Sequence, residues 1–478
     1  MRLFLLACAL LGLTSAWAQS RNDSWFVGRT QWISFSNGAP QTVLGQPRGA
    51  WRTASLSDPN GQRLVYIAGS ELFNRNDQHV LGAPVAFSAG NNGQPNVILP
   101  MPGYPQRLVV FGMPWFPNAS RLEYVTVDMS LDNGLGGSLD TIFNRVTNYT
   151  HRPGGQFTAV PHANGTDYWV VMHEEGSDAF YSFLLSAQGV DTVPVITHSG
   201  SVIPAAHFGG MMVASYQGDR IALSTHSGDF PAPDDSSDVE LFSFDAANGT
   251  LGFLCNLPGF SKPRSVEFSP LGTKLYVAEQ YQLPAVVLEL WQYDLTGTNC
   301  VDIEASKTLI WQDTTTDSGF INSFRTLGLA PDGRIYHRNF WTQGYLGVVN
   351  DPDATGAACG YVRDGFLAMT DTLWCITNQC KRYHDSDSPW TGLREEPTSV
   401  SITLWPMPLH DQGWLRLDPG VVFDELQWID GLGRCVRHQR TAPVNGLPIN
   451  RGTLSAGVFA IRILRNSRAL GVLRVVVE

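Results

Sequence analysis

Apolar and polar residues alternate in short runs along most of this chain, and one two-strand unit recurs. Each copy has an apolar strand, a turn of glycine with aspartate, asparagine or proline, and a second strand rich in valine, isoleucine and tyrosine. A period of two predicts β-strands, and the glycine turns predict tight hairpins. Six copies are visible, at residues 53–70, 96–113, 158–174, 211–227, 265–280 and 326–340.

The spacing of these hairpins predicts the architecture. The copies begin about 40 to 60 residues apart, which is the period of a propeller blade with loop insertions. Further strands recur at residues 121–137, 239–253 and 288–300. We therefore predict an all-β chain whose main domain, residues 19–384, is a β-propeller of six or seven blades. A seventh blade would combine residues 25–36 with the segment after Phe340, and a two-sheet sandwich is the alternative fold.

Composition agrees with this reading and removes other classes of protein. The chain has 47 glycines and 29 prolines, and only 16% of its residues are charged, which excludes coiled coils and long helical bundles. Aromatic residues make up 11%, too many for a disordered chain. The net charge is −11 and the cations are scattered, so we expect no nucleic-acid partner, which would require a basic stripe.

The N-terminus predicts export. Residues 1–18 contain Arg2, an apolar run over 3–13 and the triplet Ala16-Trp17-Ala18, the pattern of a secretory signal peptide cleaved between Ala18 and Gln19. A buried N-terminal helix is the alternative. No later window approaches the ~18 apolar residues that a membrane span needs, so we expect no transmembrane anchor.

The cysteines of the mature chain predict disulfides. Their number is even, and an exported protein reaches an oxidising compartment. Six cysteines allow about 15 pairings, among which the sequence does not choose. Zinc binding at Cys375 and Cys380, the two cysteines closest to each other in the sequence, is the alternative, but a matching second pair of ligands is missing. The six are Cys255, Cys300, Cys359, Cys375, Cys380 and Cys435.

Several stretches resemble a known group of exported proteins. They are residues 25–28, 73–76, 127–131, 134–136, 162–171, His173, 266–270, 329–336, 346–350 and 357–359. In order and spacing they are similar to the extracellular WD-repeat-like proteins of Bacteroidetes, often labelled as gliding-motility or PKD-domain-containing proteins. The resemblance implies an extracellular propeller. It ends near residue 365, and residues 375–390 replace the piece that such proteins carry there.

The last 80 residues carry a second resemblance. It rests on a Pro-x-Pro segment, a Leu-Gly-Arg turn and a Gly-Val-Phe-x-Ile-Arg strand, with the residues Pro406, Pro408, Gly433, Arg434, Gly457 and Arg462. Residues 400–478 thereby resemble a type IX secretion sorting domain, with Phe459 in place of the usual Tyr and Met407 in place of Asn. The resemblance implies passage through the type IX machinery, usually with removal of this domain. Residues 385–399 read as a linker, and an ordinary appended β-sandwich is the alternative.

Candidate binding residues are few. His162 and His173 bracket a hairpin that also contains Asn164 and Asp167, and such a set could bind a ligand or a metal. The alternative is that Asn164-Gly165 forms the turn and the neighbouring side chains only tie its backbone. Trp291, Trp311, Phe340 and Trp341 lie near predicted strand ends, where aromatic rings could stack on sugars or partner proteins.

We predict no metal or other cofactor, with one alternative. Clustered carboxylates in a proline-containing loop could hold Ca²⁺, although the EF-hand spacing is absent. They are Asp229, Asp234, Asp235 and Asp238.

Two functions remain after these steps. The chain lacks the Gly-x-Ser-x-Gly, His-Glu-x-x-His and phosphate-loop motifs. This favours a secreted or cell-surface propeller that binds a surface polymer, a glycan or a partner protein without catalysis. The alternative is an extracellular hydrolase or lyase whose site in the central channel is assembled from residues distant in sequence.

Overall fold

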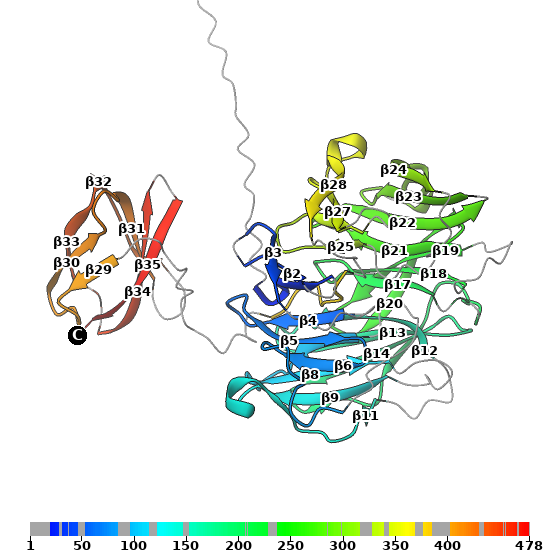
Figure 1. The fold of residues 1–478 in the computed structure, drawn as a ribbon, viewed down its shortest axis with the longest axis horizontal. Coiled ribbons are helices and arrows are strands. Elements are labelled where there is room, and N and C mark those ends of the chain that lie inside the picture. Colours follow the sequence, from blue (N-terminus) through cyan, green and yellow to red (C-terminus); the bar gives the residue numbers. More distant parts are fainter. Residues whose placement is uncertain are drawn as a thin grey trace, which may run out of the picture. The chain divides into compact units, whose positions relative to one another are not determined.

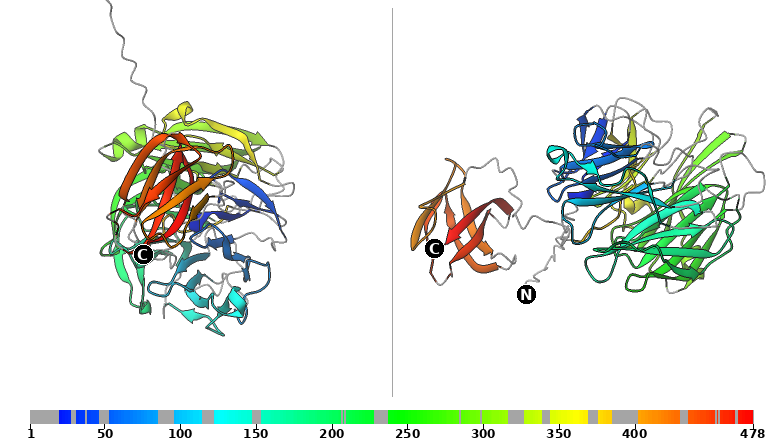
Figure 2. Two further views of the ribbon diagram at one scale, coloured as in Figure 1. Left: turned by 90° about the vertical axis from the view of Figure 1, so that its left-hand side faces the viewer. Right: turned by 90° about the horizontal axis from the view of Figure 1, so that it is seen from below.

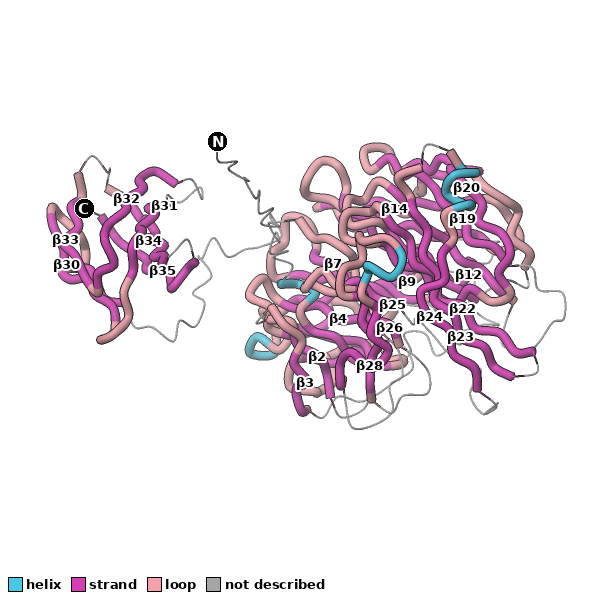
Figure 3. The backbone as a smooth tube through the Cα atoms, turned by 90° about the horizontal axis from the view of Figure 1, so that it is seen from above, coloured by secondary structure: helices cyan, strands magenta, loops and turns pink. Residues whose placement is uncertain are grey.

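The computed structural model describes most of the chain between Ser20 and Val477 as antiparallel sheets joined by turns (Figures 1 and 3). The described residues are 20–27, 31–36, 38–45, 53–84, 96–113, 122–146, 153–205, 207, 209–227, 237–283, 285–297, 299–315, 327–338, 344–368, 376–384, 402–429, 435–452, 454, 456–465 and 468–477. The predicted signal peptide with Ala18 and Gln19, and the predicted linker 385–399, lie outside them. The chain divides into two units, Met1–Ser388 and Pro389–Glu478.

Seven sheets make up the described part of the first unit, and we number them as blades in chain order. Blade 1 consists of β1 (Ser24–Phe26), β2 (Gln31–Ser34) and β3 (Gln41–Leu44). Blade 2 consists of β4 (Thr53–Ser57), β5 (Arg63–Ala68) and β6 (Glu71–Asn74). Blade 3 consists of β7 (Asn96–Pro100), β8 (Arg107–Gly112), β9 (Glu123–Asp128), β10 (Gly137–Ser138) and β11 (Asn144–Arg145). Blade 4 consists of β12 (Pro153–Pro161), β13 (Tyr168–Glu174), β14 (Ala179–Ser186), β15 (Gly189–Val190) and β16 (Val195–His198).

The last three blades have four strands each. Blade 5 consists of β17 (Gly209–Ala214), β18 (Arg220–His226), β19 (Ser237–Asp245) and β20 (Thr250–Phe260). Blade 6 consists of β21 (Pro263–Phe268), β22 (Lys274–Leu283), β23 (Ala285–Asp294) and β24 (Thr308–Thr315), and blade 7 of β25 (Leu327–Leu329), β26 (Ile335–His337), β27 (Tyr345–Val349) and β28 (Tyr361–Leu367). The described helices of this unit are short: η1 (Ser20–Asn22), η2 (Asp132–Gly134), α1 (Cys300–Ala305) and η3 (Gly356–Cys359). None of them is long and apolar enough to cross a membrane.

Buried hydrophobic clusters join each blade to the next and close the ring. One cluster lies in each of the interfaces from blades 1–2 to blades 6–7. In the closing cluster, Tyr336 and Val348 of blade 7 pack against Trp25 and Phe35 of blade 1, and the blue and yellow strands accordingly lie side by side in Figure 2. The predicted β-propeller is therefore confirmed, and the six predicted hairpins are the first two strands of blades 2 to 7.

The ring closes differently from our expectation for a seventh blade. Among the described residues, blade 1 is built from residues 24–44: β1 pairs with β2 and β2 with β3, and no described strand that follows Phe340 joins this sheet. The segment after Phe340 instead completes blade 7 with β27 and β28. The remaining described part of that segment, residues 376–384, follows another course.

Residues 376–384 lie on the propeller axis. Their hydrogen-bond partners include β1, β4, β7, β12 and β21, which are the first, inner strands of their blades, and the turn between β12 and β13. Thr377 donates to the carbonyl oxygen of Phe26 at 2.9 Å, and Asn378 donates to the carbonyl oxygens of Thr53 and Asn96 at 2.8 and 2.7 Å. The segment therefore occupies the space of a central channel at the level of these strands.

One of the expected disulfides forms among the described cysteines. Cys255 of β20 is bonded to Cys300 of α1, whereas Cys359 and Cys380 are free and buried. Both free thiols behave as small apolar side chains, in the blade 6–7 cluster and the blade 3–4 cluster. Burial raises the pKa of Cys380 to about 12. Cys375 lies outside the described residues, as does the side chain of Cys435.

The second unit is a small antiparallel sandwich, as predicted. One sheet holds β29 (Ile402–Trp405), β30 (Gln412–Leu417) and β33 (Gly446–Asn450), and the other β31 (Phe423–Ile429), β32 (Cys435–Val444), β34 (Gly457–Arg465) and β35 (Arg468–Val477). Leu404 and Leu415 of the first sheet share a core with Trp428 and Ile461 of the second. Of the sorting-domain residues, Pro406 and Pro408 follow β29, Gly457 and Arg462 lie on β34, and Gly433 and Arg434 lie outside the described residues.

Candidate functional site

Three of the predicted site residues tie the turn between β12 and β13. The amide oxygen of Asn164 accepts hydrogen bonds from the backbone N–H groups of Thr166 and Asp167, each at 3.0 Å. The Asn164 amide nitrogen donates to the Asp167 carboxylate at 2.8 Å, and His162 accepts from the Asn164 N–H at 2.9 Å. This arrangement holds the backbone of the turn, which is the structural alternative considered above.

His173 lies at the other end of β13, away from this turn. Its side chain is buried and packs edge-on against Phe180, with ring centroids 4.8 Å apart. Burial lowers the pKa of His173 to about 4, so the imidazole is neutral at pH 7. The structure thus brings His162, Asn164 and Asp167 together but separates them from His173.

The remaining predicted site residues are mostly not described. Trp341, Asp229, Asp234 and Asp235 lie outside the described residues. Asp238 lies on β19, where its carboxylate accepts a hydrogen bond from the Asn256 amide at 2.8 Å. Among the described side chains, no three of His, Cys, Asp or Glu gather closely enough to hold a metal ion.

Ionisable side chains gather instead in the interface between blades 5 and 6. Glu279 and Glu289 lie on the same face of blade 6 as Val277 and Trp291. Each glutamate is two residues away from one of them along its strand, and side chains two residues apart on a strand share a face. We call this group the blade 5–6 strip, and it consists of His226, Arg264, Glu279, Glu289, Trp291 and Lys307. These residues come from β18, β21, β22, β23 and the turn before β24.

The inner end of the strip is shaped around His226. This histidine pairs with Gly209 across β17 and β18, and a Cβ on Gly209 would fall 2.1 Å from its ring. Only glycine therefore allows the imidazole to lie against the inner strand. Burial, followed by the charge of Arg264, lowers the pKa of His226 well below its usual range.

The middle of the strip holds two opposed carboxylates in different environments. Glu279 and Glu289 are directly opposite each other on β22 and β23, and both are buried. Burial raises the pKa of Glu279, and the charge of Glu289 adds to this effect. Glu289 accepts hydrogen bonds from the Trp291 indole at 3.0 Å, the Gln312 amide at 2.8 Å and the Tyr281 hydroxyl at 3.2 Å.

The outer end of the strip is a lysine on two aromatic rings. The ammonium group of Lys307 lies 4.0 Å from the ring centroid of Phe260 and 4.6 Å from that of Trp291. Lys307 and Trp291 are half-buried, so solvent reaches this end. Burial lowers the pKa of Lys307, and the charges of Glu279 and Glu289 oppose that shift.

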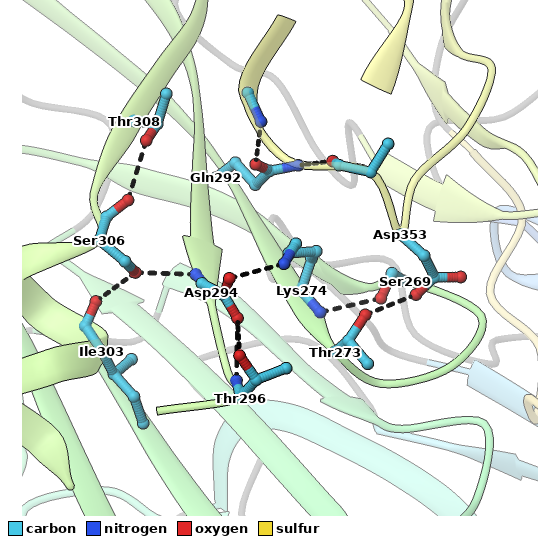
Figure 4. A network of polar contacts seen from close by, with 12 residues as sticks. Ser269, Thr273, Lys274, Gln292, Asp294, Thr296, Ile303, Ser306, Thr308 and Asp353 are labelled. Atoms are coloured by element: carbon cyan, nitrogen blue, oxygen red, sulfur yellow. Dashed lines mark hydrogen bonds and ion pairs between the residues drawn. The ribbon is translucent and has the colours of Figure 1, made fainter. Parts of the chain in front are cut away.

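Two anchors position Lys307. The Cys255–Cys300 disulfide attaches the start of α1 to β20. On the other side, the Ser306 hydroxyl accepts from the Asp294 N–H at 2.8 Å and donates to the Ile303 carbonyl oxygen at 2.6 Å (Figure 4). Lys274 in turn holds the Asp294 carboxylate at 2.8 Å and lowers its pKa to about 2. The segment 300–306, which directly precedes Lys307, is therefore fixed at both ends, by the disulfide at Cys300 and by the hydrogen bonds of Ser306.

A groove of about 260 Å³ also lies between blades 5 and 6, among their turns. Its polar side chains already have partners: Gln217 donates to the Pro270 carbonyl oxygen at 3.0 Å and Arg220 to the Gly272 carbonyl oxygen at 3.3 Å. Thr273 donates to Asp353 of blade 7 at 2.8 Å (Figure 4). The side chains that line the groove therefore connect the turns to one another. Because they are engaged in this way, the strip is the better candidate site.

Trp291 was the one residue of the strip that sequence reasoning singled out. Sequence reasoning missed Glu279 and Glu289, because no motif marks either residue and the two lie in separate strands. A signal was nevertheless present. Residues 274–283 and 285–294 form one long hairpin, and its register places Glu279 opposite Glu289. Like charges directly opposite each other are unfavourable in a hairpin, so such a pair is informative.

Comparisons with known proteins find solved structures that are similar at low sequence identity. No protein-family model matches the chain, and no curated protein matches it. Similar solved structures include a candidate 6-phosphogluconolactonase from Bacteroides uniformis, with a TM-score of 0.46, 12% identity and coverage of 74% of this chain and 99% of that chain. Another is the periplasmic gluconolactonase PpgL of Pseudomonas aeruginosa, with a TM-score of 0.35, 12% identity and coverage of 89% and 98%. A third is hydrazine synthase of Kuenenia stuttgartiensis, with a TM-score of 0.40, 13% identity and coverage of 69% and 87%.

Proposed function

We propose that this chain is an exported β-propeller that binds a surface polymer, a glycan or a partner protein at the blade 5–6 strip. The observation that carries the proposal is the outer end of the strip, where Lys307 and Trp291 are reached by solvent beside the buried Glu289. An aromatic surface next to charged hydrogen-bonding groups suits ligands that have both apolar faces and hydroxyl groups. Residues 376–384 on the axis also favour a site between blades over one in a central channel.

Binding without turnover is favoured by the protonation of the buried histidines. Acid–base catalysis is most effective when the catalytic pKa lies near the working pH. Burial lowers the pKa of His173 to about 4 and that of His337 to about 3, and it lowers the pKa of His226 as well. These imidazoles are neutral at pH 7 and change charge only in acid.

A hydrolase or lyase is the second candidate, and one observation favours it. Burial raises the pKa of Glu279, and the opposed Glu289 accepts hydrogen bonds from three side chains. A carboxylic acid with a raised pKa close to a second carboxyl group is the usual arrangement of an acid and its partner in glycoside cleavage. Product release from a bound glycan would identify this activity.

The binding proposal is tested with the full-length mature protein on a glycan array and against outer-surface extracts. Lys307→Met keeps the length of the side chain and removes its charge, so it should abolish the strongest propeller-dependent signal. Gln217→Ala in the turn groove is the matched control and should bind like the wild type. Equal binding by Lys307→Met and the wild type would refute the strip as the site.

For export, we infer passage to the cell surface or medium through the type IX machinery, by way of the periplasm. The support is the sequence resemblance of residues 400–478, the signal-like N-terminus and the Cys255–Cys300 disulfide, which requires an oxidising compartment. Deletion of residues 400–478 should leave the protein in the periplasm. Unchanged release into the medium would contradict this inference.

A further inference from the structure

The second unit exposes two tryptophans on the outer face of its three-stranded sheet. Trp405 of β29 and Trp414 of β30 are 79% and 53% exposed, although tryptophan in a small domain is usually a core residue. They are directly opposite each other in the antiparallel register. Their side chains therefore stand on the same face, about 5 Å apart at Cβ.

A third ring extends this pair into a row across the sheet. Pro448 of β33 is opposite Trp414 and is also exposed, so the row Trp405–Trp414–Pro448 crosses all three strands. Gly446 leaves room beside the Trp414 indole, because a Cβ there would lie 3.3 Å from the indole nitrogen. The indole thus lies close to the sheet, and the row forms a shallow aromatic platform.

Polar side chains flank the platform on both sides. Thr403 and Arg416 are opposite each other on one side, and Gln412 is opposite Asn450 on the other. All four residues are exposed. Aromatic rings with hydroxyl, amide and guanidinium groups on either side match a chain of sugar rings, which has apolar C–H faces and hydroxyl edges. Arg416 is the one charged group among these side chains.

We infer that this platform binds a neutral polysaccharide, a site separate from the blade 5–6 strip and beyond the function proposed above. The size of the platform favours a narrow ligand. The two indoles expose roughly 300 Å² together, if a free tryptophan exposes about 250 Å². A stable protein interface needs about 800 Å² per partner. The row also crosses strands that are spaced about 4.8 Å apart, close to the length of one pyranose unit.

Affinity electrophoresis of the full-length mature protein in gels containing glucomannan, xylan, laminarin or pullulan tests this inference. At least one of these polysaccharides should retard the wild type. The double variant Trp405→Ala/Trp414→Ala should bind at least tenfold more weakly, with Trp405→Phe/Trp414→Phe between the two. An unchanged melting temperature would show that the alanine variant is folded, since both indoles are exposed.

Each alternative occupant has a distinct outcome. Lack of retardation by all four polysaccharides, or equal retardation of the wild type and the alanine variant, would overturn the inference. A wild-type dimer that the alanine variant converts to a monomer would assign the platform to a second copy, and loss of export would assign it to the secretion machinery. Retardation that Lys307→Met abolishes and the alanine variant retains would place polysaccharide binding in the strip instead.

Discussion

Two groups of buried charge in the described part of the propeller differ in a way that separates structure from binding. On the axis, Lys381 forms an ion pair with Glu267, and the Glu267 carboxylate also accepts a hydrogen bond from the Leu329 N–H at 3.0 Å. Both side chains are buried, and the pair joins segments 114 residues apart. In the blade 5–6 strip, two carboxylates and the half-buried Lys307 lie together.

This difference indicates two roles for buried charge in one fold. A buried charge is costly unless a partner and hydrogen bonds compensate it, and the axial pair has both. It therefore attaches the axial segment to blade 6, next to the first strand of blade 7. In the strip, solvent reaches one end and the pKa values of Glu279 and Lys307 are displaced, so these two groups are available to a ligand. The following changes test that distinction, beginning with the one we expect to be most disruptive.

Removal of one partner of the axial pair should have the largest effect. Lys381→Met leaves the buried Glu267 without its cation and should lower the free energy of unfolding by about 3–5 kcal/mol. Chemical denaturation monitored by tryptophan fluorescence measures the loss. Binding per folded molecule should not change, because Lys381 lies on the axis and is not one of the residues of the blade 5–6 strip. A loss below about 1 kcal/mol would show that the axial pair contributes little to the stability of the propeller.

Loss of the disulfide should come next and should affect both properties. Cys255→Ser/Cys300→Ser opens a loop with a sequence separation of 45 residues, and we expect a loss of about 2–4 kcal/mol in the free energy of unfolding. Because α1 precedes Lys307, the same variant should also weaken ligand binding. Denaturation and array binding are both measured on it, and normal binding would contradict the anchoring of Lys307 by α1.

Acid should destabilise the propeller through its buried histidines. The pKa of His173 falls from 6.5 to about 4 on folding, so between these values the unfolded chain binds a proton that the folded chain does not. The free energy of unfolding then decreases as pH falls, by up to about 1.4 kcal/mol per pH unit for one such histidine. His173→Phe should reduce this slope in denaturation curves between pH 6.5 and 4. An unchanged slope would show that His173 is not buried in its neutral form.

The smallest change in stability is expected at the strip itself. Lys307→Met removes a cation from the faces of two partly exposed rings and should cost less than about 1 kcal/mol of unfolding free energy. Its effect on ligand binding should nevertheless be at least tenfold. Lys381→Met would thus lower stability and leave affinity unchanged, whereas Lys307→Met would lower affinity far more than stability. A Lys307→Met protein as unstable as Lys381→Met would remove the distinction between the two regions.

Sequence patterns predicted the local structure well and the long-range structure poorly. The Asn164-Gly165 turn and the alternation in each hairpin are local signals, and all six hairpins formed where expected. The axial course of residues 376–384 depends on partners such as Phe26, 351 residues away from Thr377. Neither periodicity nor turn chemistry carries information about such pairs.

The candidate site shows the same limit. Trp291 was visible as an aromatic residue near a strand end, but its neighbours come from four other segments of the chain. Exposed aromatics were expected on the propeller rims. The two most exposed tryptophans described, Trp405 and Trp414, lie in the second unit instead, and burial is a property of the folded chain that residue type does not determine.

The most direct test of the strip uses a background without the platform. The array measurement is made on the full-length Trp405→Ala/Trp414→Ala protein, with and without Lys307→Met, so that the remaining signal reports the propeller. We predict that the background protein retains binding and that the added Lys307→Met weakens this binding at least tenfold. Equal binding by the two proteins would contradict the assignment of ligand binding to the blade 5–6 strip.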